Sequence, residues 1–264
     1  MSAKKGITPL INMHQDVYSR KFCGEGFPDW AMESNFNKTK HVAFPWPLAD
    51  PFEVDENQHP SRETCNMLYP KLDWPDWHFT QALSSAVGNL YDNHNGLRDK
   101  FANFWGYVAE QFKDSEDIIG YELINEPWAG NIYQDPTLLI PGIADREKLG
   151  PMYDEINTEI RKHDEDRLIF FESVTWEITG LGEKIGFQHA PGGHEFANRS
   201  VLSFHNSINP SKSPQPYYWD KKMKEVERLG IAAAVTETNG DMDAGIKMTL
   251  ADKYGTSWMH WAYK

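Results

Sequence analysis

The chain has 264 residues, 40% of them hydrophobic, which suits one large domain with a sizeable core. Its formal net charge of −13 argues against nucleic acid and anionic membrane surfaces as partners and is typical of an acidic soluble protein. No apolar run is long enough to span a bilayer, and the first residues carry no signal-peptide pattern. Nucleotide-binding glycine motifs and zinc-type His/Cys motifs are absent from the sequence, so nothing in it supports a metal or a cofactor.

The first predicted strand runs from Gly6 to Asp16 and ends in polar groups. His14 and Asp16 lie two residues apart and therefore share a face of that strand. They either form a structural pair or exchange hydrogen bonds with sugar hydroxyls, and as metal ligands they lack a third partner. Residues 20 to 95 form a long excursion rich in Pro, Trp and Asp, which we expect to be partly helical and to form a wall of the site.

The two cysteines, Cys23 and Cys65, both lie in this excursion. Two glycosylation triplets, at Asn37 and Asn198, favour an oxidising compartment, in which disulfides form and persist. We therefore predict a Cys23–Cys65 disulfide that fixes the excursion and a secreted or lysosomal location for the full-length protein. The alternative is a pair of buried free thiols.

The remainder of the chain alternates between apolar runs and amphipathic segments. Further strands are predicted over residues 118–128, 166–174, 200–207, 230–240 and 256–263. Helices are predicted over residues 79–91, 97–113, 146–163, 220–229 and 243–254. Five apolar residues recur at helical spacing in the second helix and are expected in the core: Phe101, Phe104, Trp105, Val108 and Phe112.

Two of the apolar runs end in a carboxylate. Asn125-Glu126-Pro127 follows one run, and its proline cannot continue a strand ladder. Glu237 follows another run in the same way. Carboxylates on two strand ends of one barrel are what glycoside hydrolysis requires, one to protonate the leaving oxygen and one to attack or to activate water. Alternatively, Asn-Glu-Pro could be a helix start with Glu126 near the positive end of the dipole.

Six strands that alternate with helices predict an α/β fold, a (β/α)₈ TIM barrel that is incomplete. The long excursion takes up the residues that two further βα units would need. We interpret residues 1–264 as one partial catalytic domain that carries strands three to eight, with the first two βα units missing.

The chain resembles the endoglycoceramidases of glycoside hydrolase family 5 over nearly its whole length. Four segments carry the resemblance: MHQDVYSRKFCGEGFPDWA from Met13 to Ala31, GYELINEPWAG from Gly120 to Gly130, FFESVTW from Phe170 to Trp176, and PGG from Pro191 to Gly193. The resemblance implies a retaining hydrolase that cleaves the β-glucosyl linkage between an oligosaccharide and ceramide in glycosphingolipids. It also implies contact with a lipid surface, while no sequence feature specifies the oligomeric state.

The resemblance assigns roles to individual residues. Glu126 matches the general acid/base and Glu237 the nucleophile, while Asn125 would bind the 2-hydroxyl beside the scissile bond. His205 would belong to the network around the two carboxylates. Three residues would shape the sugar subsite: His14, Asp16 and Trp261.

Two departures from the family pattern bear on the position of Glu237. Ser207 stands where the family usually has a tyrosine two residues after His205, and Thr238 follows Glu237 where the family favours phenylalanine. Two other readings therefore stay open. One is a family 5 enzyme for another β-glucoside, such as glucosylceramide, a sterol glucoside or a cellooligosaccharide, and the other is a non-catalytic glycan-binding protein.

Overall fold

The computed structural model describes residues 5–33, 54–57, 59–68, 74–175, 184–206, 215–238 and 244–262. Within them, one sheet contains six parallel strands in the consecutive order β1 to β6. The strands are β1 (Leu10–Asn12), β2 (Gly120–Glu122), β3 (Leu168–Phe171), β4 (Ser200–Asn206), β5 (Ala232–Thr238) and β6 (Ser257–His260).

All six predicted strands are present, and their consecutive parallel order is that of a TIM-barrel-like half-barrel. β1 is much shorter than the predicted strand over residues 6–16. Its continuation leaves the ladder after Met13, and Asp16 forms an isolated antiparallel bridge with Glu25 instead. The polar end of the predicted strand thus pairs with the excursion rather than with the sheet.

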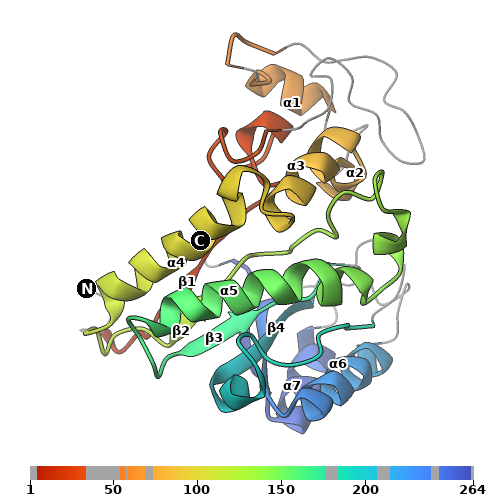
Figure 1. Cartoon of the computed structure of the whole chain (residues 1–264). Coiled ribbons are helices and arrows are strands. Elements are labelled where there is room, and N and C mark those ends of the chain that lie inside the picture. Colours follow the sequence, from red (N-terminus) through yellow and green to blue (C-terminus); the bar gives the residue numbers. More distant parts are fainter. Residues whose placement is uncertain are drawn as a thin grey trace.

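The helices are α1 (Arg62–Leu68), α2 (Trp74–His78), α3 (Gln81–Tyr91), α4 (Leu97–Phe112), α5 (Gly150–Arg161), α6 (Gln215–Leu229) and α7 (Ala244–Tyr254). Helices α4 to α7 pack along the outer face of the sheet, and α1, α2 and α3 form a separate group above it in the view of Figure 1. Short helical turns are η2 (Arg20–Phe22), η3 (His94–Gly96), η4 (Pro136–Leu139), η5 (Asp145–Leu149) and η6 (His194–Arg199). The excursion is partly helical, as predicted, because α1, α2 and α3 fall within it.

The helix predicted over residues 146–163 begins with a π-helical turn, Asp145–Leu149, before α5. Pro151 lies in the first turn of α5 and has no N–H to donate to the preceding turn. The hydrogen-bond pattern therefore widens ahead of this proline, which apolar spacing alone does not reveal.

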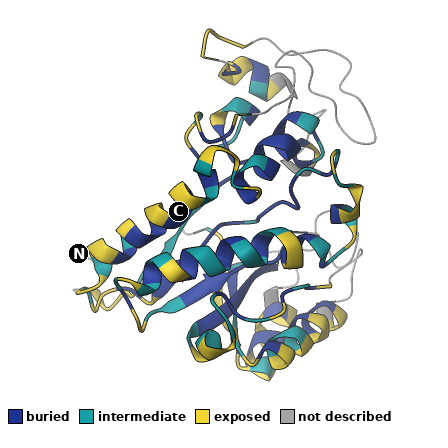
Figure 2. Cartoon of the chain, in the orientation of Figure 1, coloured by how far each residue is buried: buried dark blue, intermediate teal, exposed yellow. Residues whose placement is uncertain are grey.

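The main core lies between the outer face of the sheet and helices α3, α4 and α5 (Figure 2). Tyr121, Ile169 and Phe171 face it from the strands. Alternate strand residues face the inside of the curl. The apolar inner cluster consists of Phe170, Val201 and Ala234, with Leu10 and Leu168 packed against it.

Several large apolar side chains stay exposed at the two edges of the sheet. On the β1 side, Ile7 is 60% exposed, and on β6 Trp258 is 41% and Met259 37% exposed. The expectation that all five aromatic and aliphatic positions of α4 are core is wrong for Phe104, which is 45% exposed. This side chain lines an apolar hollow together with Trp30, which is also exposed.

The disulfide prediction is confirmed. Cys23 and Cys65 are bonded, with Cα atoms 5.6 Å apart, and the bond joins the turn after η2 to α1. None of the helices in the described ranges has the length and apolar character needed to cross a membrane.

Candidate active site

The predicted catalytic residues lie at the C-terminal ends of strands of the sheet. Glu126 follows β2, and Glu237 is close to the end of β5. His205 lies on β4 directly opposite Glu237 in the parallel ladder. The register between β4 and β5 shifts between Phe204 and His205, and such a bulge redirects the side chains that follow it. The sheet therefore brings together residues that are far apart in the sequence.

His205 lies between the two predicted catalytic carboxylates. Its Nδ1 is 2.7 Å from Oε1 of Glu126 and 3.6 Å from Oε2 of Glu237. Carboxylate oxygens of Glu126 and Glu237 lie within 4.8 Å of each other. Both carboxylates are partly open to solvent, with 17% and 16% of the side chain exposed, whereas His205 is buried.

A third carboxylate, Glu172, belongs to the same cluster and was not predicted as a site residue. Its Oε1 is 3.4 Å from Nε2 of His205 and accepts a hydrogen bond of 3.2 Å from the backbone N–H of Glu126. The side chain is only 4% exposed. The sequence signal for it was its place directly after the apolar run of β3, the same signal that identified Glu126 and Glu237.

The charges of this cluster shift its proton affinities. Burial raises the pKa of Glu172 well above its ordinary value. Burial is also the main cause that raises the pKa of Glu237, to about 7; attraction to His205 opposes this rise, and repulsion from Glu126 adds to it. Burial lowers the pKa of His205, but the carboxylates, with Glu172 first, outweigh this effect and raise it to about 10. At neutral pH the cluster therefore holds an imidazolium among carboxyl groups.

The second predicted group lies on the other side of Glu237. Nδ1 of His14 is 3.9 Å from Oε1 of Glu237, and its Nε2 is 3.6 Å from Oδ2 of Asp16. The neighbouring Asp16 carboxylate raises the pKa of His14. Trp261, which is 52% exposed, stacks on the His14 ring with centroids 5.1 Å apart and planes at 9°. His14, Asp16 and Trp261 thus form a polar and aromatic rim beside Glu237.

Asn125 is fully enclosed rather than open to the site, with 1% of its surface exposed. Its Nδ2 donates to the backbone carbonyl of Gln15 at 3.1 Å, whereas its Oδ1 has no partner among the described residues. Its contact with a sugar hydroxyl stays a prediction. Ser207 and Asn37 lie outside the described residues, while Thr238 is buried and donates to the carbonyl of Asn206.

Among the residues that the structure describes, two groups of side chains offer metal-ligating atoms within 4.8 Å of one another. They are Glu126, His205 and Glu237, and separately His14, Asp16 and Glu25. Glu25 is thus a third partner that the sequence did not indicate for His14 and Asp16. A raised pKa keeps the proton on His205, and a histidine must be neutral to bind a metal. An ion bound by the first group would therefore have to displace the proton of His205.

Comparisons with known proteins identify the family that the chain resembles. The sequence pattern of the family described as Cellulase (glycosyl hydrolase family 5) matches residues 75–264. An endoglycoceramidase of Hydra vulgaris is 43% identical to the chain over 268 residues, and one of Cyanea nozakii is 42% identical over 271 residues. The chain is covered completely in both comparisons, but it spans 49% and 51% of these relatives, about half of their length.

Among solved structures, endo-glycoceramidase II from Rhodococcus sp. in complex with ganglioside GM3 superposes with a TM-score of 0.71 and 18% sequence identity. The superposition covers 99% of this chain and 58% of that one. At this level of identity the likeness establishes the fold.

Proposed function

The chain belongs to glycosyl hydrolase family 5, and from that premise we propose that it carries the active site of a retaining β-glycosidase. One observation carries the proposal: one carboxylate oxygen of Glu126 and one of Glu237 lie within 4.8 Å of each other at the ends of two strands, which is consistent with the shorter of two known separations. Retaining enzymes place their two carboxyl groups about 5–5.5 Å apart, whereas inverting enzymes leave about 6.5–9.5 Å for a water molecule.

In the proposed reaction Glu126 is the general acid/base and Glu237 the nucleophile. Glu237 attacks the anomeric carbon, the glycosidic bond breaks, and Glu126 transfers its proton to the leaving oxygen. Water then loses a proton to Glu126 while it attacks the same carbon and releases Glu237. The raised pKa of Glu237 supports a proton held in the cluster near neutral pH, and attack by Glu237 requires this proton to lie on Glu126. Protonated His205, 2.7 Å from Glu126, balances the negative charge of the pair.

For the substrate, we propose a glycosphingolipid that is cut between its oligosaccharide and ceramide. The two relatives with 43% and 42% identity are named endoglycoceramidases, which supports this choice over other β-glucosides. His14, Asp16 and Trp261 would bind the sugar adjacent to Glu237, since aromatic faces and hydrogen-bonding side chains are suited to sugar rings. The lipid part of such a substrate would bring the enzyme to a lipid surface.

We further propose that β1 to β6 are strands three to eight of an eight-stranded barrel, with two further βα units to close it. The exposed apolar side chains at both sheet edges support this, because strands of a closed barrel are covered on both faces. A secreted or lysosomal location is supported by the Cys23–Cys65 disulfide and by the exposed position of Asn198 in its glycosylation triplet.

The experiment is a substrate panel on the gene product that contains this sequence. Ganglioside, glucosylceramide and cellooligosaccharide are compared by chromatography of the released sugar, and the anomer first formed is read by NMR. We expect intact oligosaccharide from the ganglioside, released with retained configuration, and no release by a Glu237→Gln variant. Preferential cleavage of cellooligosaccharide would instead favour the function that the family description names. Binding without turnover would favour a glycan-binding protein.

A further inference from the structure

The main chain of Glu126 has an unusual conformation. Its φ angle is 42°, in the left-handed region that side-chain-bearing residues seldom adopt. Such a conformation is strained in a residue that carries a side chain and persists only where the surroundings hold it in place. The proposed acid/base residue therefore needs contacts that fix its backbone.

Three groups hold Glu126, each at a different point. The backbone N–H donates to Oε1 of Glu172 at 3.2 Å. The backbone carbonyl accepts a hydrogen bond of 3.1 Å from Nε2 of Gln15. Nδ1 of His205 contacts the carboxylate itself at 2.7 Å. Hydrogen bonds thus hold the main chain of Glu126 on both sides of its Cα atom.

Both polar atoms of the Gln15 side-chain amide make hydrogen bonds to the main chain around Glu126 or to its own loop. The Nε2 atom also donates to the carbonyl of Asn125 at 2.6 Å, so that it binds two consecutive carbonyls. Its Oε1 accepts from the backbone N–H of Tyr18 at 2.7 Å, and Nδ2 of Asn125 returns a hydrogen bond to the Gln15 carbonyl. The residue is 0% exposed, so no solvent competes for these bonds.

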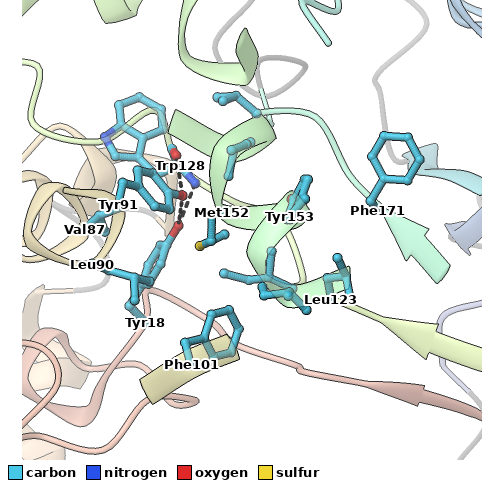
Figure 3. Packing of buried hydrophobic residues seen from close by; sticks show 14 of the residues in the cluster. Tyr18, Val87, Leu90, Tyr91, Phe101, Leu123, Trp128, Met152, Tyr153 and Phe171 are labelled. Atoms are coloured by element: carbon cyan, nitrogen blue, oxygen red, sulfur yellow. Dashed lines mark hydrogen bonds between the residues drawn. The ribbon is translucent and has the colours of Figure 1, made fainter. Parts of the chain in front are cut away.

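The surrounding chain is shaped to admit this side chain. A Cβ atom on Gly26 would come within 2.5 Å of the Gln15 Cβ, and the φ angle of Gly26 is +125°. Only glycine satisfies both conditions at little cost. The hydroxyl of Tyr18 accepts a hydrogen bond from the Trp128 backbone N–H at 2.7 Å and contacts the hydroxyl of Tyr91 (Figure 3). The loop that follows Glu126 is therefore held by the same segment as Gln15.

Resting on the proposed function, we propose that Gln15 is a positioning residue for Glu126: its amide holds the Asn125 and Glu126 carbonyls so that the Glu126 carboxyl faces the leaving oxygen. Gln15 does not touch the sugar or the reacting atoms. It acts through Glu126, and its loss impairs proton transfer rather than the attack by Glu237.

Kinetic measurements can distinguish a positioning role of Gln15 from a purely structural role. A dinitrophenyl lactoside has a leaving group that departs without a proton, whereas the alkoxide of an alkyl lactoside needs one. A displaced Glu126 therefore slows cleavage of the alkyl lactoside selectively. The ratio of the two kcat/KM values also does not depend on the fraction of folded enzyme, because both substrates meet the same active molecules.

The test compares Gln15→Met, an apolar side chain of similar length, with wild type in the gene product that contains this sequence. General acid catalysis contributes about 10²–10⁴-fold, so a displaced acid should lower kcat/KM for the alkyl lactoside by about 10–100-fold. The dinitrophenyl lactoside should change by less than about 3-fold if attack by Glu237 is intact. Ser84→Ala is the matched control, since it removes another buried side chain that binds a backbone carbonyl, that of Gly130 at 2.6 Å.

A second variant covers the case in which Gln15→Met does not fold. In Gln15→Glu a buried carboxylate faces two carbonyl oxygens and repels them, while its protonated form can donate to one of them. Its activity on the alkyl lactoside relative to wild type should therefore rise as the pH falls. Equal losses on both substrates in either variant, or the same ratio change in Ser84→Ala, would overturn the proposal. If wild type cleaves neither substrate, the proposed function fails rather than the role of Gln15.

Discussion

Replacement of Glu237 by glutamine should stabilise the protein above neutral pH while it abolishes hydrolysis. The folded-state pKa of Glu237 is about 7, against an ordinary value of 4.5. Because the folded state holds the proton more tightly, ionisation destabilises it: the penalty is absent below pH 4.5, grows between pH 4.5 and 7, and is complete above pH 7. The shift corresponds to about 3 kcal/mol at most, and solvent screening at the partly open site reduces it to about 1–2 kcal/mol.

Thermal unfolding of the gene product containing this sequence, followed by near-ultraviolet circular dichroism at pH 4.5 and pH 8, measures this effect. Glu237→Gln should raise Tm at the higher pH by about 2–6 °C and leave it unchanged at the lower pH. Glu116→Gln, at an exposed surface position, removes the same charge and should change Tm little at either pH. A Tm gain that is equal at both pH values, or a loss at the higher pH, would refute the electrostatic reasoning.

Three further outcomes are expected. Removal of the disulfide by Cys23→Ser with Cys65→Ser, which opens a link between positions 42 residues apart, should lower the free energy of unfolding by about 2–4 kcal/mol in urea titration, and no change would show that the excursion is held by packing alone. Trp261→Ala should raise KM for the lactosides by about 10-fold with little change in kcat, whereas Trp261→Phe should keep KM close to the wild-type value. The 264-residue chain expressed by itself should aggregate or bind a hydrophobic dye, because Ile7, Trp258 and Met259 are exposed at its sheet edges; a monomer with a cooperative thermal transition and hydrolytic activity would contradict this.

The strands and the two strand-end carboxylates could be predicted from the sequence because their signals are local. Parallel strands are buried on both faces and read as continuous apolar runs, and a carboxylate directly after such a run falls at the C-terminal edge of the sheet. The bounds of helix α4 could be predicted within one residue because its apolar residues recur at helical spacing. That spacing does not reveal whether a neighbouring element covers each face of the helix. Phe104 fits the helical spacing, yet its side chain is exposed.

The supporting residues could not be predicted because their contacts are long-range. Gln15 and Asn125 are 110 positions apart, and nothing in either segment indicates the other. Glu172 followed a strand just as Glu126 did, yet only its distance to His205 distinguishes a site residue from a chance strand end. The shift of register between Phe204 and His205 likewise depends on how β4 and β5 pair.

The interior of the half-barrel holds buried polar atoms that the described residues leave without partners. Inside the curl, below the carboxylate cluster, Asn12 donates to Glu122, but Oε1 of Glu122 and Oδ1 of Asn12 have no partner among the described residues. The buried hydroxyls of Ser203 and Thr236 also have no hydrogen-bond partner among the described residues. Each such atom costs about 1–3 kcal/mol unless a donor, an acceptor or ordered water reaches it. Exposed apolar edges and unsatisfied polar atoms inside the curl are separate observations, and both are relieved if further strands close the barrel. Those strands would then do more than cover the core, because polar groups that they brought to Glu122 would lie in the interior on which the Glu126, Glu172 and His205 cluster rests.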